Sequence, residues 1–295
     1  MSSAARDLLE GAIDCHVHAA PSLFPRWGDG HAVARACARA GMGGVVLKYH
    51  HGSSVEMAAA VHASTPSVRV LGGVVLNRFV GGLNPDAVDA AVALGAKVVW
   101  LPTLHAAFHG QALGVQGGFP FQHSALRRKA GAGIGILGED GRLAPEVLEI
   151  VELLEGRGVV LATGHVGYPE IAALAAHLRE AKRDVPLLVN HVRFFAPRLT
   201  MEEIAALAGE RTWFELCFFT TCAMARAATV DEVAGMLRER PDLPWIVASD
   251  AGQAQNPAPP EALGGFVERL VAAGAMEGVV RRGLVDNPRE MLGVE

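Results

Sequence analysis

The stretch GVVLATGH, residues 158–165, is the unit from which the fold can be inferred. An apolar, β-branched run of this length is typical of a strand that is buried on both faces, and here it ends in a histidine. Further runs of the same kind occupy residues 11–17, 43–50, 68–77, 96–102, 185–191, 212–217 and 244–250. Alanine-rich stretches separate them. This alternation predicts parallel strands that are connected by helices.

The stretches between the runs carry the start signals of helices. Proline stands at the expected first turn in three of them, and a threonine followed three residues later by glutamate predicts a capping box in two others. The prolines are Pro85, Pro145 and Pro169, and the boxes are Thr200 with Glu203 and Thr229 with Glu232.

Eight strand–helix units in 295 residues predict an α/β fold, a single (β/α)8 TIM-type barrel that spans residues 1–295 as one domain. An open doubly wound sheet has the same alternation and is the alternative. One inserted loop, at about residues 103–140, follows the fourth strand. Within it we expect a small extra strand and turn at 133–143. Long loops at the carboxyl ends of barrel strands usually build the substrate pocket.

Composition excludes several classes of protein. The net charge of −5 provides no basic patch for nucleic acid, and no uninterrupted apolar run is long enough to span a bilayer. The start of the chain does not have the pattern of a secretory signal. The scattered cysteines Cys15, Cys37, Cys217 and Cys222 are expected to be reduced thiols of a cytoplasmic protein.

Phenylalanines at 117–123 and 193–197 fit a homo-oligomer contact or a cover over a small-molecule substrate.

Histidines recur at one position of the repeating unit. His16, His18, His165, His191 and also Asp250 lie at the carboxyl ends of predicted strands. In a barrel these ends converge on one mouth. Alternation along a strand places His16 and His18 on one face, with Cys15 and Val17 on the other.

These residue types suit a catalytic metal. Imidazole nitrogens bind zinc and related divalent ions, and three of them leave a position open for water. A carboxylate beside the ion can bind it and move a proton. We therefore expect a divalent metal, with zinc as the ion, held by His16, His18, His165 and Asp250, and with His191 as a further ligand or as a group that polarises the substrate.

The motifs DCHVH (14–18), GH (164–165), NH (190–191) and SD (249–250), with the ending DNPREMLG (286–293), resemble the amidohydrolase superfamily of metal-dependent hydrolases. The resemblance implies that His16, His18 and His165 are metal ligands, that His191 is a ligand or catalytic polariser, and that Asp250 is ligand and general base. Many members bridge two ions through a carboxylated lysine or a glutamate at the end of strand 4. The fourth strand here ends without either, so we expect one ion.

Other residues are candidates for the same mouth. We expect substrate binding, or the binding of a second metal ion, from four of them: Lys48, His105, Arg193 and Arg26. Whether Lys48 carries CO₂ as a bridging carbamate or contacts the substrate as a cation stays open. Asp14 is expected to support the ligands or to make a structural hydrogen bond, and Glu215 to line the barrel or to face a helix. His50, His51 and Tyr49 are expected in the pocket wall.

The sequence thus predicts a metal-dependent hydrolase in which a metal-activated water cleaves an amide, ester or lactone bond, or less readily a phosphoester. A metal-dependent decarboxylase on the same barrel and a non-catalytic metal-binding barrel are the alternatives. The run GIGILG (133–138) matches a dinucleotide-binding pattern, but a turn follows it rather than a helix, which argues against nicotinamide chemistry.

Overall fold

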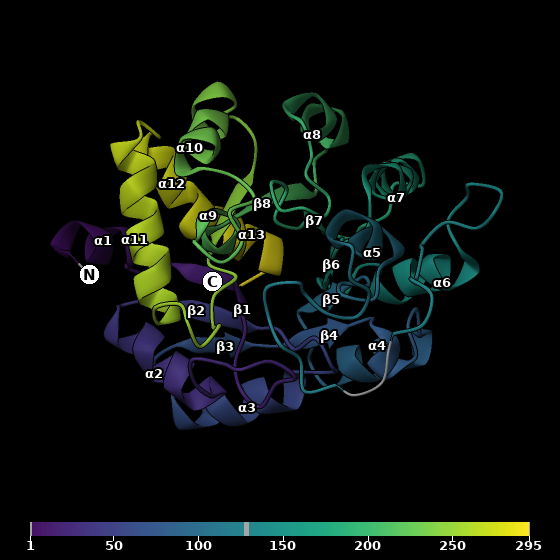
Figure 1. Cartoon of the computed structure of the whole chain (residues 1–295), viewed down its shortest axis with the longest axis horizontal. Coiled ribbons are helices and arrows are strands. Elements are labelled where there is room, and N and C mark those ends of the chain that lie inside the picture. Colours follow the sequence, from purple (N-terminus) through teal and green to yellow (C-terminus); the bar gives the residue numbers. More distant parts are fainter. Residues whose placement is uncertain (1, 127–129, 295) are drawn as a thin grey trace.

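The computed structural model describes residues 2–126 and 130–294. Strands lie at the centre and helices surround them (Figure 1). The strands are β1 (Ile13–Val17), β2 (Gly44–Leu47), β3 (Arg69–Leu71), β4 (Gly73–Val75), β5 (Val98–Trp100), β6 (Val160–Ala162), β7 (Leu187–Val189), β8 (Thr212–Cys217) and β9 (Trp245–Ala248). The helices are α1 (Ser3–Leu9), α2 (Gly30–Arg39), α3 (Val55–Ser64), α4 (Pro85–Ala93), α5 (Ala107–Leu113), α6 (Pro145–Leu154), α7 (Tyr168–Glu180), α8 (Met201–Leu207), α9 (Phe218–Thr221), α10 (Val230–Glu239), α11 (Pro259–Ala272), α12 (Glu277–Leu284) and α13 (Asp286–Leu292), with a 3-10 turn η1 (Arg78–Val80).

The strands form the predicted barrel, in sequence order and with parallel pairings. β1, β2 and β3 pair in one sheet, and β4 to β9 pair in another. The two sheets meet within a single predicted strand, 68–77, because Gly72 separates β3 from β4. The ring closes where the amide of His18 donates to the carbonyl of Ala251, at 2.8 Å, beside a parallel bridge between Val17 and Ala251. The (β/α)8 prediction is confirmed.

The break at Gly72 has a local cause in Ser54. The Ser54 hydroxyl donates to the Leu47 carbonyl at the end of β2, at 2.6 Å, and accepts from the Gly73 amide, at 3.0 Å. The Ser54 amide donates to the Gly73 carbonyl. One residue, through its hydroxyl and its amide, therefore supplies hydrogen bonds that a continuous ladder between β2 and β4 would make.

A helix closes the barrel at the amino-terminal ends of the strands. One apolar cluster draws residues from around the ring, among them Ile13, Trp100 and Trp213, and Met291 and Leu292 of α13 complete it. The Asn287 side chain donates to the carbonyl of Trp245, where β9 begins, at 2.8 Å. The DNPREMLG segment thus plugs the end of the barrel opposite to the predicted mouth.

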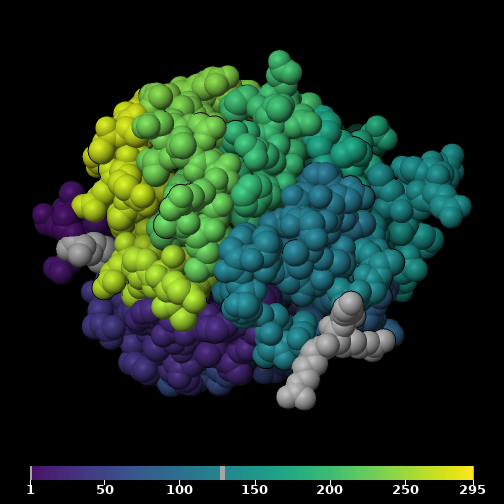
Figure 2. All heavy atoms as spheres, in the orientation of Figure 1, coloured from purple at the N-terminus to yellow at the C-terminus, as the bar shows by residue number. Residues whose placement is uncertain are grey.

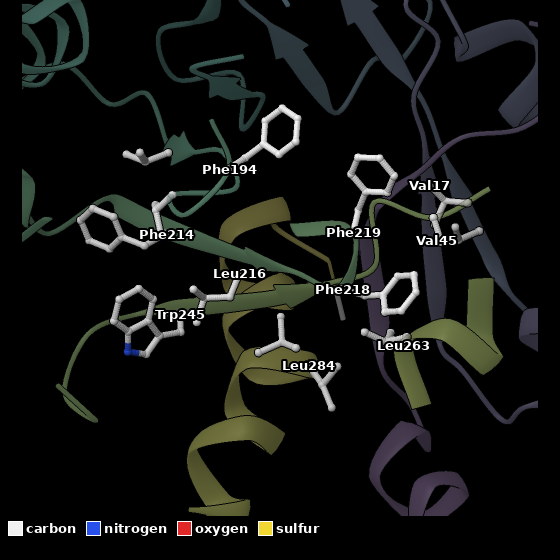
Figure 3. Packing of buried hydrophobic residues seen from close by; sticks show 14 of the residues in the cluster. Val17, Val45, Phe194, Phe214, Leu216, Phe218, Phe219, Trp245, Leu263 and Leu284 are labelled. Carbon is white, nitrogen blue, oxygen red and sulfur yellow. The ribbon is translucent and has the colours of Figure 1, made fainter. Parts of the chain in front are cut away.

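A second, larger cluster fills the layer between strands and helices. Figure 3 shows part of it, with Phe214 of β8 beside Trp245 of β9 and Phe218 beside Leu263 of α11. The predicted helix starts are confirmed: prolines stand in the first turns of α4, α6 and α7, and both capping boxes form. Within residues 2–126 and 130–294, no helix has the length and apolarity needed to cross a membrane.

The inserted loop folds back on itself. It contains α5, and its ends are held together where the Ala107 amide donates to the Ile134 carbonyl and the Ile134 amide to the His105 carbonyl. We expected a small strand and a turn at 133–143. The turn is present, but the prediction of a strand is wrong, because only isolated bridges form there. The blue and teal part of Figure 2 places the insertion on the face shown there, against the green segments that follow it. Residues 127–129 of the predicted insertion lie outside the described residues.

Candidate metal centre

A small cavity of about 20 Å³ lies at the carboxyl ends of the strands. That volume is close to the room taken by one water molecule. Most of the predicted site residues meet here. The lining residues are His16, His18, Arg26, Lys48, His50, Phe119, Phe121, Gln122, His165, His191, Phe194, Phe219, Asp250 and Gln253. We call this space the central cavity.

A bulge in β1 helps to direct both of its histidines inward. The pairing of β1 with β2 shifts register between Asp14 and Val17, so strict alternation fails there. Cys15 packs with the apolar cluster inside the barrel, which corrects the prediction that it faces away from the site. Asp14 has a structural role: its Oδ1 accepts from the amides of Ser249 at 3.0 Å and His16 at 3.3 Å.

The hydrogen bonds of His16 and His18 fix their tautomers. Nδ1 of His18 lies 2.9 Å from the carbonyl of Lys48, which can only accept, so Nδ1 carries the proton. Nδ1 of His16 lies 3.2 Å from each carboxylate oxygen of Glu215. Burial lowers the pKa of His18 well below its usual value. Nε2 of both rings faces the cavity, where Nε2 of His16 lies 3.1 Å from Nζ of Lys48.

His165 is held in the same way by a residue of the insertion. Nε2 of His109 lies 2.8 Å from the Gly118 carbonyl and so carries a proton, while Nδ1 of His109 lies 2.6 Å from Nδ1 of His165. Burial lowers the pKa of His109 to about 4, so this ring is neutral at pH 7. The shared proton then belongs to His165, and Nε2 of His165 is a bare acceptor.

Asp250 and His191 complete the mouth from a strained backbone. Both have left-handed φ angles, 48° and 25°, which residues other than glycine adopt rarely. Oδ1 of Asp250 lies 3.1 Å from Nε2 of His18 and 3.3 Å from Nε2 of His16. Among residues 2–126 and 130–294, nothing forms a hydrogen bond with the buried Nδ1 of His191. The next turn tolerates this geometry because Gly252 has no Cβ to strike the His18 carbonyl.

Glu215 connects three parts of the site. It lies on β8, fully buried, and besides His16 it accepts from the Asn190 side chain at 2.9 Å and from the His191 amide at 3.0 Å. Burial alone would raise the pKa of this carboxyl, but the His16 imidazole and these donors hold it well below its usual value. Glu215 is therefore a barrel-lining carboxylate, one of the two positions predicted for it.

Two cations border the central cavity. Lys48, 1% exposed, brings Nζ to 3.1 Å from Nε2 of His16 and to 5.3 Å from the ring centre of Trp100. Arg26 donates through Nε to the Ser22 hydroxyl at 3.0 Å, and burial lowers its pKa to about 10 against the opposing effect of Asp250. Both predicted cations are thus at the site.

The structure does not bring His105 or Arg193 to the central cavity. His105 lines a neighbouring cavity, where its ring packs edge-on against Phe79 at 4.8 Å. Arg193 donates to the Leu199 carbonyl at 2.8 Å and lies 3.6 Å from Glu232. In the expected pocket wall, His50 lines the cavity and stacks on His18 at 4.6 Å. Tyr49 and His51 instead stack on each other and are not among its lining residues.

Sequence reasoning missed two site residues, His109 and Cys217. His109 comes from the insertion, where no local pattern marks it. Phe119 and Phe121 belong to the segment 117–123, for which a substrate cover was one of the two roles expected, and with Gln122 they line the central cavity. Cys217, which was predicted only as a reduced thiol, ends β8, and its sulfur lies with donor atoms of His16 and Asp250 within 4.8 Å of one another. Its position two residues after Glu215 on one strand face is the signal that was available.

The donor set fits a divalent cation. Nε2 of His16 and Nε2 of His18 face the same carboxylate oxygen of Asp250 at 3.3 and 3.1 Å. Three possible ligand atoms thus converge at the centre of the mouth, and Nζ of Lys48 lies 3.1 Å from one of them, Nε2 of His16. Nitrogen with one carboxylate is a ligand set that zinc accepts.

Comparison with known proteins identifies a family and a fold. A family model described as "Family of unknown function (DUF6282)" matches residues 11–215. No curated protein matches the sequence.

Several solved structures share the fold. One is an amidohydrolase from Pseudomonas aeruginosa, with TM-score 0.62, 13% identity, and 99% of this chain and 98% of that chain covered. Another is a probable 2-pyrone-4,6-dicarboxylic acid hydrolase from Acinetobacter baumannii, with TM-score 0.61, 13% identity, and 96% and 99% covered. A third is an enamidase described as a member of the amidohydrolase superfamily, with TM-score 0.53, 14% identity, and 97% and 68% covered. The predicted resemblance to this superfamily is confirmed for the fold.

Proposed function

This chain belongs to the DUF6282 family, and from the site described above we propose that it is a metal-dependent hydrolase that cleaves an amide, ester or lactone bond of a small molecule with an activated water. One observation carries the proposal. Nε2 of His16, His18 and His165 and the carboxylate of Asp250 line one buried cavity, and hydrogen bonds behind three of them keep their lone pairs toward it. With the three imidazoles as ligands and Asp250 as the base, a fourth coordination position would be open for water, as in catalytic zinc sites.

A zinc ion bound there would lower the pKa of its water to about 7 and polarise a carbonyl oxygen. The proposed base is Asp250, whose Oδ1 lies 3.1 and 3.3 Å from two candidate ligand atoms and which would take the proton of the attacking water. The same carboxyl would return the proton to the leaving group. For His191, which also lines the cavity, the proposed role is that of a ligand or of a donor to the substrate oxygen.

We propose one ion. In the described part of the chain, Asp250 is the sole carboxylate that lines the central cavity, and the end of β5 provides no bridging lysine or glutamate. Lys48 follows the last residue of β2, and its Nζ lies 3.1 Å from Nε2 of His16. A carbamate on Lys48 would supply a bridge, so a count of two ions per chain would implicate it.

Arg26 supports a substrate that carries a carboxylate. A half-buried guanidinium beside a cavity can hold an anion with two hydrogen bonds. The neighbour described as a probable 2-pyrone-4,6-dicarboxylic acid hydrolase was solved with citric acid bound. That anionic ligand agrees with the proposal for Arg26.

The proposal is tested by turnover of an ester and lactone panel, with and without a carboxylate, in ¹⁸O-labelled water. We expect zinc-dependent hydrolysis with one ¹⁸O in the acid product. Release of CO₂ without ¹⁸O incorporation would replace the proposal by a decarboxylase. Metal binding without turnover of any compound would point to a binding protein.

A further inference from the structure

We propose that His109 is a positioning residue that couples closure of residues 114–122 over the central cavity to the coordination of the metal by His165. We call residues 114–122 the cover segment. The inference rests on the proposed metal centre. It adds a residue from the insertion, which none of the strand-end motifs contains.

The first step is a continuous chain of hydrogen bonds from the cover segment to the candidate ligand. The Gly118 carbonyl accepts from Nε2 of His109 at 2.8 Å, and Nδ1 of His109 accepts from Nδ1 of His165 at 2.6 Å. The two rings stack at 4.9 Å, and His109 is fully buried. The orientation of the backbone at Gly118 therefore decides which nitrogen of His109 is bare, and this in turn decides which nitrogen of His165 is bare.

The second step is the position of Phe119. Its ring lies 5.2 Å from His109, 6.1 Å from His165 and 5.7 Å from His50. The residue next to the carbonyl that orients His109 thus covers the candidate ligands directly. A backbone displacement that carries Phe119 outward would move the Gly118 carbonyl with it, because the two residues share a peptide bond.

The third step is that the cover segment must move to admit a substrate. The central cavity has room for about one water, whereas a neighbouring cavity has a volume of about 740 Å³. Phe119 and Gln122 line both, so they form the wall between them. A small-molecule substrate must displace this wall to reach the metal. Opening would break the bond between Gly118 and His109 at the moment of entry.

Coupling follows from these contacts. Closure of the cover segment favours the His165 tautomer that binds metal, and the bound metal favours the same tautomer and therefore closure. Linkage requires the two effects to be equal in free energy. The cover segment is thus held more firmly in the metal-loaded protein than in the metal-free protein.

Three substitutions separate the two hydrogen bonds. His109→Asn places an amide oxygen near the position of Nδ1, which keeps the acceptor for His165 and loses the reach to Gly118. His109→Gln places an amide nitrogen near the position of Nε2, which keeps the donor to Gly118 and loses His165. His109→Phe keeps an aromatic ring and loses both. His177→Gln is the control, because His177 lies on α7 and does not line the central cavity.

Zinc affinity, measured by competition with a chelating dye, reads out the bond to His165. We expect a loss of about 10- to 100-fold in His109→Gln and His109→Phe, as is usual when the partner of a ligating histidine is removed. His109→Asn and the control should remain within about threefold of the wild type. The visible spectrum of the Co²⁺-loaded protein should change in the same two variants. Wild-type affinity and spectrum in His109→Phe would overturn the proposal.

Amide hydrogen exchange of peptides that cover 114–122 reads out the bond to Gly118. Zinc should slow exchange there in the wild type and in the control, and this slowing should be lost in His109→Asn and His109→Phe. Equal slowing in all proteins would overturn the coupling even if zinc affinity changed. If the wild type binds no zinc, the proposed function fails instead, so the two failures are distinguishable.

Discussion

Both carboxylate oxygens of Glu215 lie 3.2 Å from Nδ1 of His16. This contact connects β8 to β1 across the floor of the candidate metal centre. It makes His16 a better ligand, because the carboxylate orients the ring and increases the basicity of Nε2.

Replacing Glu215 should therefore lower the affinity for the metal without unfolding the chain. Glu215→Gln can keep one hydrogen bond to His16 but removes the negative charge, and we expect zinc affinity to fall about 10- to 100-fold. Chelator competition measures the change. Glu210→Gln, at an exposed position, is the matched control. Equal zinc affinity in Glu215→Gln and wild type would show that the charge does not support His16.

Asp250 should be needed for turnover. Asp250→Asn leaves a side chain of the same size that cannot take a proton, so we expect kcat/KM to fall at least about 100-fold. Asp242→Asn removes a carboxylate that pairs with Arg240 at the surface and serves as the control. Hydrolysis at the wild-type rate in Asp250→Asn would remove Asp250 from the proton transfer.

Arg26 should select anionic substrates. Arg26→Met keeps the length of the side chain and removes its donors, so kcat/KM for a carboxylate-bearing ester should fall about 10- to 100-fold, the value of a charged hydrogen bond. A neutral ester of the same shape should be unaffected. Arg193→Met provides the comparison, because Arg193 engages Leu199 and Glu232 instead. Equal losses for both esters in Arg26→Met would contradict a carboxylate contact.

Asp14 should make stability depend on pH. Burial raises its pKa from 3.8 to about 6 in the folded chain, against its hydrogen bonds to Ser249 and His16. The folded state therefore binds the proton more tightly than the unfolded state. Below about pH 4 the side chain is protonated in both states and does not lower the free energy of unfolding. Between about pH 4 and 6 it lowers the free energy of unfolding progressively, and above that range the reduction is constant.

Asp14→Asn keeps an oxygen for both amides and carries no charge. In metal-free protein, its free energy of unfolding relative to wild type should rise by up to about 3 kcal/mol from pH 4 to pH 7. Urea unfolding at the two pH values measures this difference. A difference that does not change with pH would contradict a raised pKa for the buried Asp14 carboxyl.

The parts of the site that the sequence predicts are those at strand ends. His16, His165 and Asp250 could be placed because a strand run precedes each, and the carboxyl ends of barrel strands meet. His105 was misplaced because β5 ends at Trp100, and strand alternation carries no information past that point. The prediction that Cys15 lies on the strand face opposite to His16 is wrong, because a bulge interrupts the alternation between Asp14 and Val17.

The contribution of the insertion could be predicted only in part: a cover by the phenylalanines of 117–123 was one of two expectations, whereas the contact of His109 with His165 was not foreseen. His109 reaches His165 across 56 positions of sequence, and Phe119 covers the ligands from a loop without periodicity. Such contacts depend on how the loop closes, here through Ala107 and Ile134. Local propensity does not encode a closure of this kind.

Metal content per chain tests the central claim most directly. Elemental analysis should be made on protein reconstituted with zinc and dialysed, for the wild type and for His16→Asn combined with His18→Asn. The account predicts about one zinc per wild-type chain and none in the double variant. No retained ion in the wild type, or equal retention in both proteins, would contradict the metal centre.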